Sequence, residues 1–172
     1  MKNKIKYSHS IVLQYDDFSD VTKINIDKIN EYVSKILDAL LSFDEVYKNA
    51  CFFNLKFKTL SFDIIFINDD EIHKINKEYR QKDRPTDVIT FALFADDDFK
   101  MIFEDEINLG EILISLDTAK RQAEDGNREL ETEILTLITH GILHLFGFDH
   151  QTEEDYNFII KVQDDVLNVI LP

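Results

Sequence analysis

The chain is 172 residues long and 44% hydrophobic, a size and composition that predict a single folded domain over residues 1–172. Its net charge is −15, from 19 basic and 34 acidic residues, which argues against general binding of nucleic acid, so no DNA partner is expected. A lone cysteine excludes an intrachain disulfide, and the lack of a secretory leader or membrane-length apolar run predicts a cytoplasmic protein without a membrane partner.

The first half of the chain contains strand patterns separated by helix patterns. The stretch 10–15 is rich in β-branched residues and predicts a strand, and apolar residues recur at helical spacing over about 27–42. Residues 62–67 predict a buried strand, followed by a helix that runs through Tyr79. The stretch 44–58 is ambiguous, since its second part alternates like an exposed strand.

Helix patterns dominate the second half of the chain. Strands are predicted at 87–94 and 110–115, joined by an acidic segment that should be a solvated loop. Helices should follow at about 116–125, 129–146 and 152–169. Because strands come early and helices late, we predict an α+β domain with one small sheet.

Basic residues gather in one part of this acidic chain. Between positions 71 and 84, five basic residues outnumber three acidic ones, which gives a local balance of +2 and leaves −17 for the rest. A polyanion that binds this protein should therefore bind there. A solvated helix face explains the same charges equally well.

Three of the five histidines lie between positions 140 and 150. Residues four apart share one face of a helix, so His140 and His144 can bind one ion. Gly147 can end that helix in a left-handed conformation, which would return His150 to the same ion. Three imidazoles leave a fourth coordination position open, as in catalytic zinc sites, and we predict one bound Zn²⁺.

The same histidine spacing is the zinc-binding frame of metzincin proteases. Those enzymes carry a glutamate base directly after the first histidine, where this chain has Gly141. They also have a methionine turn after the motif, whereas Met1 and Met101 both precede it. A peptidase is therefore disfavoured.

A second motif lies at residues 75–91 and reads Ile-Asn-Lys-Glu-Tyr-Arg-Gln-Lys-Asp-Arg-Pro-Thr-Asp-Val-Ile-Thr-Phe. It resembles the N-x-x-Y-R-x-x-D-[KR]-P-T-[DN]-V signature of the YbeY family, the bacterial rRNA maturation factors known as single-strand-specific endoribonucleases. Leu109–Ser115 is similar to that family's L-G-D-I-x-I-S strand. His140–His150 matches its H-G-x-L-H-L-x-G-[YF]-D-H motif at every defined position.

The resemblance covers roughly residues 61 to 155 and has two departures. The family usually has Ser-Phe-Pro where this chain has Thr90, Phe91 and Ala92. Its last helix commonly carries a methionine followed by acidic residues, where this chain has Ile159 and Ile160. Neither departure touches the histidines.

The resemblance implies a zincin-like α+β fold, with a small, mostly parallel four-stranded sheet packed with about five helices. It implies that His140, His144 and His150 bind zinc, and that Arg80 holds a phosphate in the adjacent cleft. It further implies a metal-dependent endoribonuclease of single-stranded RNA that acts in 16S rRNA 3′-end maturation and ribosome quality control. The expected partners are rRNA and the small ribosomal subunit or its assembly proteins.

The sequence leaves two points open. The general base could be Asp149, water activated by the metal or the ribose 2′-OH, and Asp149 could equally be a turn residue after Gly147. The function could instead be that of a ribosome-assembly or RNA-binding factor with a structural zinc. The charge of −15 favours such docking on a protein or ribosomal surface, whereas the open coordination position favours catalysis.

Overall fold

The computed structural model describes residues 8–15, 24–96, 100 and 102–172, and it contains one sheet in this part of the chain. The sheet has the strand order β1-β2-β4-β3, where the strands are β1 (Ser8–Tyr15), β2 (Thr59–Ile67), β3 (Val88–Phe91) and β4 (Glu106–Ser115). β1 pairs in parallel with β2, and β2 in parallel with β4. β3 is an edge strand that runs antiparallel to β4, so the sheet is mixed.

Seven helices accompany the sheet within the described residues, against the expectation of about five. They are α1 (Ile26–Ser42), α2 (Asp44–Asn49), α3 (Asp69–Arg80), α4 (Leu93–Asp96), α5 (Leu116–Asp125), α6 (Leu130–Leu145) and α7 (Glu153–Ile170). The two helices that were not predicted, α2 and α4, have 6 and 4 residues, too few to show a helical period. The α+β class is confirmed.

Two further boundaries differ from the sequence prediction. The strand expected over 87–94 ends at Phe91, because the apolar residues after it begin α4. The strand-like alternation after Phe53 does not form a strand: Phe53 and Leu55 donate backbone hydrogen bonds to Ala50 and Phe52 in consecutive turns. Its aromatic residues serve packing instead, as where Phe57 lies edge to face on Phe52 with ring centroids 5.7 Å apart.

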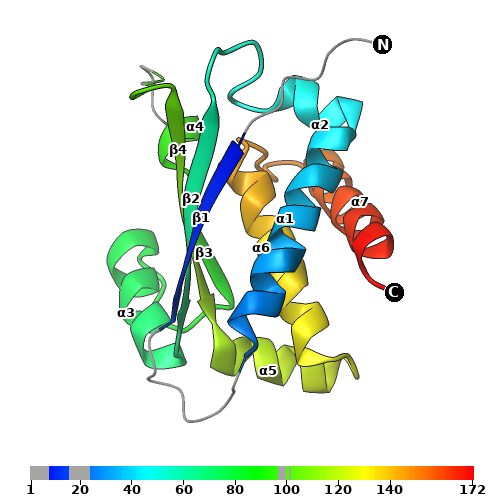
Figure 1. Cartoon of the computed structure of the whole chain (residues 1–172). Coiled ribbons are helices and arrows are strands. Elements are labelled where there is room, and N and C mark those ends of the chain that lie inside the picture. The colour runs from blue at the N-terminus through cyan, green and yellow to red at the C-terminus, as the bar shows by residue number, and fades with distance from the viewer. Residues whose placement is uncertain (1–7, 16–23, 97–99, 101) are drawn as a thin grey trace.

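Helices cover the sheet on both faces (Figure 1). Alternate residues of β2 face opposite sides: Ile64 and Phe66 belong to the main core with α1 and α6, whereas Ile67 belongs to a smaller cluster with Ile72 of α3. α7 lies on the far side of α1 and α6 from the sheet (Figure 1). The metal-binding motif on α6 and the basic motif at the end of α3 therefore start from opposite faces of one sheet.

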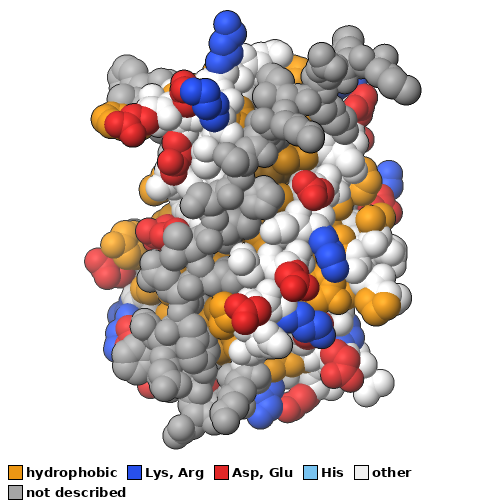
Figure 2. Space-filling view, viewed as in Figure 1, with side chains coloured by type: hydrophobic (Ala, Val, Ile, Leu, Met, Phe, Trp, Pro, Cys, Tyr) orange, Lys and Arg blue, Asp and Glu red, His pale blue; other side chains and the backbone are white. Residues whose placement is uncertain are grey.

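Charges are mixed on the side of the molecule seen in Figure 2, where acidic and basic side chains alternate with small hydrophobic areas. Among the described residues on this face, positive charge is not concentrated in a patch suited to a polyanion. No helix in the described part of the chain has both the length and the apolar character needed to cross a bilayer.

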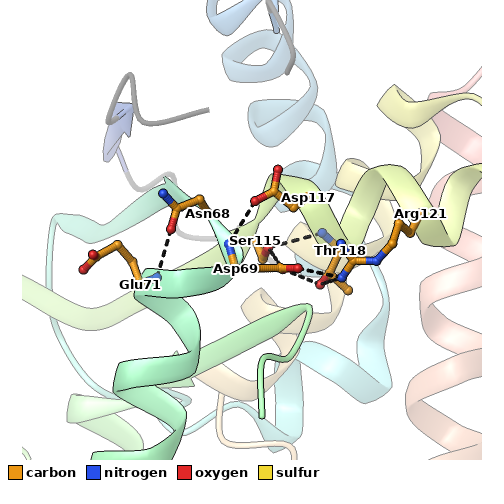
Figure 3. Close-up of polar contacts among 7 residues, drawn as sticks. All are labelled: Asn68, Asp69, Glu71, Ser115, Asp117, Thr118 and Arg121. Carbon is orange, nitrogen blue, oxygen red and sulfur yellow. Dashed lines mark hydrogen bonds and ion pairs between the residues drawn. The ribbon is translucent and has the colours of Figure 1, made fainter. Parts of the chain in front are cut away.

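A clasp of hydrogen bonds joins the beginning of α3 to the beginning of α5 (Figure 3). The Asp69 carboxylate accepts hydrogen bonds from the hydroxyls of Ser115 and Thr118, both at 2.6 Å, and forms an ion pair with Arg121 at 2.7 Å. In return, Asp117 accepts a hydrogen bond from the Asp69 backbone N–H at 3.0 Å. The clasp fixes the start of α3 relative to the sheet, since Ser115 ends β4.

Burial acts to raise the pKa of Asp69, but the bonds from Ser115, Thr118 and Arg121 outweigh it, so the pKa lies below its ordinary value of 3.8. The clasp is therefore strongest when Asp69 is ionised. Its contribution to stability is fully present above pH ~4, where Asp69 would also be ionised in the unfolded chain. That contribution is lost as the pH falls through the lower folded-state pKa.

We predict that Asp69→Asn lowers the free energy of unfolding by about 1–2 kcal/mol near neutral pH, because the charge-assisted bonds are lost. The deficit relative to wild type should shrink in acid, and urea unfolding at near-neutral pH and at about pH 3 measures both values. Asp70→Asn is the matched control, since Asp70 is exposed and lies outside the clasp. Equal losses in the two variants would contradict the role of Asp69.

Candidate metal centre and cleft

The end of α6 brings the three histidines together. His140 and His144 lie one helical turn apart on α6, and the backbone at Gly147 has the left-handed φ of +94° that the sequence predicted. The N–H groups of Gly147 and Phe148 donate to the carbonyls of His144 and Leu143, at 2.9 and 3.0 Å, and close the helix. The chain then turns back, and His150 comes to lie beside the other two rings.

The three rings form a group that fits one metal ion. The Nε2 atoms of His140 and His144 are 3.0 Å apart, and one nitrogen from each of the three residues lies within 4.8 Å of the others. Tetrahedral zinc with bonds of about 2.0–2.1 Å needs nitrogens roughly 3.3 Å apart, so small movements would complete the site. Within the described ranges, no fourth His, Cys, Asp or Glu side chain joins this group.

Burial lowers the pKa of two of the three histidines, which favours the neutral form that binds a metal. Desolvation, helped by the neighbouring His140 and His150, lowers the pKa of His144 to about 4. Desolvation and His150 also lower the pKa of His140. Both rings are therefore neutral at neutral pH, which is the form that offers a lone pair to a metal ion.

Gln163 of α7 is a buried polar residue next to His140. It is only 7% exposed, and as a hydrogen-bond partner of His140 it has the smallest of the effects on the pKa of that ring, which it acts to raise. An amide oxygen that accepts from one ring nitrogen would leave the other nitrogen free for a metal. No sequence motif identified Gln163; its only signal is a polar residue on the buried face of the last helix.

Arg80 lines the same cleft as the three histidines. The cleft has a volume of ≈ 850 Å³, and its lining includes all three histidines together with Arg80 and Lys82. Arg80 is the last residue of α3 and is exposed. The sequence-based hypothesis placed Arg80 beside the metal site, and the structure puts both on one cleft.

The turn after α3 directs these cations into the cleft. Gln81 has a left-handed φ of 57° and ends the helix, with its N–H donated to the carbonyl of Asn76. The Asn76 side chain is buried and donates to the carbonyl of Arg84 at 2.7 Å. Asp83 accepts from His73 and Lys77, at 2.8 and 2.9 Å. These bonds give the turn a defined shape.

Asp149 lines the cleft as an exposed residue whose carboxylate bonds locally. It accepts from the His150 N–H at 2.8 Å and from the Gln151 side chain at 3.1 Å. The bond from Gln151, followed by that from His150, lowers the pKa of Asp149. The turn role that the sequence left open is therefore present, and a part in proton transfer stays a prediction.

Asp87 is a second carboxylate in the cleft, and sequence reasoning did not single it out. It accepts from the Val88 N–H at 2.8 Å, from Thr86 at 3.1 Å and from Gln122 at 3.0 Å. Its charge acts to raise the pKa of His140, opposite to the effect of burial. The available signal was its place at the start of a predicted strand, which is equally typical of a structural residue.

Gly141 faces the sheet rather than the cleft. A Cβ atom at this position would lie 2.7 Å from Cγ2 and 2.9 Å from Cδ1 of Ile112, a buried residue of β4. The glycine lets the backbone of α6 approach β4 closely. A glutamate here, as proteases have, would meet the core instead of reaching a substrate.

Comparisons with known proteins identify relatives of this chain. The family model for "Endoribonuclease YbeY" matches residues 14–170. A protein with that name from Bacillus pumilus is 37% identical over 157 residues, which cover 89% of this chain and 90% of the relative. Its counterpart from Lysinibacillus sphaericus is 36% identical over 154 residues, covering 88% and 92%.

The fold also has a solved counterpart. The solution structure of a Thermotoga maritima protein aligns with a TM-score of 0.54 at 25% sequence identity. The alignment covers 93% of this chain and 91% of that protein.

We predict that Gln163→Leu weakens zinc binding by about 10- to 100-fold, because His140 loses the acceptor that orients it. Competition with a chromophoric chelator measures the dissociation constant. Gln163→Glu is the matched control and should retain the affinity, since a carboxylate also accepts from the ring. Unchanged affinity in Gln163→Leu would contradict the supporting role.

We also predict that Gly141→Ala lowers the free energy of unfolding by about 1–2 kcal/mol, because overpacking against Ile112 outweighs the better helix propensity of alanine. Thermal and urea unfolding test this. In the double variant with Ile112→Val, which removes the Cδ1 methyl, the cost of the alanine should be smaller. A stabilised Gly141→Ala protein would show that the close approach is not required.

Proposed function

The chain belongs to the endoribonuclease YbeY family, and from that premise we propose that it hydrolyses single-stranded RNA in the cleft between α6 and the end of α3. One observation carries the proposal: a three-histidine group that fits a metal ion and an exposed arginine share one cleft. A metal ion and a guanidinium on opposite sides of a phosphodiester are a common arrangement for stabilising charge in phosphoryl transfer.

The histidines would hold one ion, which we propose to be zinc because three imidazoles and one open position suit it. When bound, such an ion supplies a Lewis acid that polarises a phosphoryl oxygen. Arg80 would hold the other oxygens of the phosphate through two parallel N–H donors. Gln163 would keep His140 in the tautomer that binds metal.

For proton transfer we propose Asp149, the cleft carboxylate next to His150. Its lowered pKa keeps it ionised at neutral pH, which is the form that can accept a proton from water, although a low pKa also makes it a weak base. Asp149 thus has two proposed roles, holding the turn at His150 and receiving the proton. Asn at this position would keep hydrogen bonds in the turn and lose the second role.

We propose rRNA as the substrate, with action at the 3′ end of 16S rRNA and in ribosome quality control in the cytoplasm. The net charge of −15 supports delivery of the enzyme by the small subunit or its assembly proteins, because free RNA is repelled over most of the surface. We further propose that residues 1–172 act as one zincin-like domain.

Two rival functions differ in what they need from the cleft. A peptidase needs a carboxylate base beside the first histidine, and Gly141 packs on Ile112 instead. A non-catalytic assembly factor needs only a closed structural zinc site, in which a fourth ligand would complete the coordination. The open fourth position and the arginine in the same cleft support catalysis.

The test compares wild type with His144→Ala and Arg80→Ala. Wild type loaded with zinc should cleave an unstructured oligoribonucleotide and leave casein intact. His144→Ala should lose both metal and cleavage. Arg80→Ala should keep the metal while kcat/KM falls by about 100-fold, and Arg80→Lys should recover only part of this loss, because lysine provides a point charge without the paired donors.

Cleavage that persists in metal-free His144→Ala would contradict a metal-dependent reaction. Loss of metal in Arg80→Ala would show that Arg80 supports the fold instead of binding phosphate. A wild-type protein that binds RNA and zinc without cleaving would favour the assembly factor.

A further inference from the structure

Tyr79 is an exposed aromatic residue directly beside the phosphate-binding arginine of the proposed function. Its side chain is 64% exposed, although it precedes Arg80 at the end of an ordered helix. Its ring contacts the ring of Phe91 on the edge strand β3, edge to face, with centroids 5.3 Å apart and an interplanar angle of 74°. This contact fixes the orientation of the Tyr79 ring, while most of the side chain is open to a ligand.

The cations around Tyr79 divide into two groups. Lys74 and Lys77, earlier in α3, form ion pairs with Glu71 and Asp83 at 2.6 and 2.9 Å. The later cations, Arg80, Lys82 and Arg84, form no ion pair with any residue in the described part of the chain. Positive charge that is free to meet phosphates therefore extends from the cleft into the turn after α3.

The chain that follows the histidines carries negative charge. Asp149 lines the cleft, and the first turn of α7 comes shortly after it in the chain, where Glu153, Glu154 and Asp155 are all exposed. A phosphate chain leaving the cleft past α7 would meet four carboxylates within seven residues. The charge distribution therefore favours a path on the α3 side, where Tyr79 lies.

We propose that Tyr79 is a stacking site for an unpaired base of the RNA, one nucleotide from the phosphate held by Arg80, with Lys82 and Arg84 contacting the phosphates that follow. The inference rests on the proposed function, since the position of the stacked base is counted from the phosphate that Arg80 is proposed to bind. Aromatic rings beside a cationic path are a general means of binding single-stranded nucleic acid, because every base offers a face for stacking.

The site would select for strandedness rather than for sequence. A base in a duplex already stacks on its neighbours and is held by its pair, so it cannot lie flat on Tyr79 without being pulled out. A base in a flexible strand has no such restraint. Tyr79 would thus give the cleft a preference for single-stranded RNA and little discrimination among the four bases.

The experiment removes the ring and the base in turn. The substrates are an unstructured, fluorescently labelled oligoribonucleotide and a series in which one nucleotide at a time is abasic, cleaved by full-length zinc-loaded enzyme. Tyr79→Ala should raise KM about fivefold or more while leaving the bound metal unchanged, and Tyr79→Phe should behave as wild type because it keeps the aromatic face. Phe103→Ala, which removes another exposed aromatic ring, is the matched control and should have no effect.

The abasic series separates stacking from a structural effect. In wild type, one abasic position near the cleavage site should raise KM as much as Tyr79→Ala does, and the same position should cost nothing further in Tyr79→Ala. Tyr79→Leu keeps apolar contact with Phe91 without an aromatic face and should behave like Tyr79→Ala. A wild-type KM in Tyr79→Leu, or additive losses from Tyr79→Ala and the abasic position, would overturn the proposal.

Fluorescence anisotropy with the same oligoribonucleotide keeps this test distinct from that of the proposed function. Wild type that binds the strand more tightly than Tyr79→Ala would support stacking even if no cleavage occurred. Wild type that cleaves, and whose affinity matches that of Tyr79→Ala, would overturn the stacking site alone. In that case the exposed ring would be free for a protein partner.

Discussion

The close packing of α6 on β4 is the constraint on which the rest of the site depends. Gly141 lets the helix backbone approach so near that a single added carbon would collide with Ile112. The face of α6 that carries His140 and His144 is thereby set at a fixed height and rotation relative to the sheet. Gln163 of α7 lies next to His140, and Gly147 returns His150 to complete the group. Gly141 thus has two consequences: the chain lacks the glutamate that proteases have at this position, and α6 can pack closely on β4.

The second half of the site depends on α3, which packs on the other face of the sheet. Its beginning is held by the Asp69 clasp, and its end by the left-handed turn at Gln81 and the bond from Asn76 to Arg84. A helix fixed at both ends can deliver Arg80 to the cleft without a bond to the arginine itself. Arg80 itself is exposed and forms no ion pair with a described residue, while the polar residues of the same motif maintain the shape of the turn.

Features of the site that lie within one segment could be predicted from the sequence. Features that arise where two elements of the fold pack together could not. The histidine spacing and the turn at Gly147 are properties of one segment, so their geometry follows from helix periodicity and glycine stereochemistry. Gln163 and His140 lie on different helices, α7 and α6, so no pattern within either segment predicts that they are neighbours. The same holds for the inward direction of Gly141, which depends on how α6 meets β4. Short helices such as α4 could not be predicted, because a single turn is too short to show a helical repeat of apolar residues.

We propose that the three histidines bind one metal ion and leave one coordination position open to the cleft that Arg80 lines. X-ray absorption spectroscopy of the zinc-loaded protein in solution tests it most directly. We expect three imidazole nitrogens at about 2.0–2.1 Å and a single additional oxygen ligand. We also expect inorganic phosphate to add a phosphorus scatterer in wild type and not in Arg80→Ala. Four protein ligands around the zinc, unchanged by phosphate, would contradict an open site and point to a structural metal.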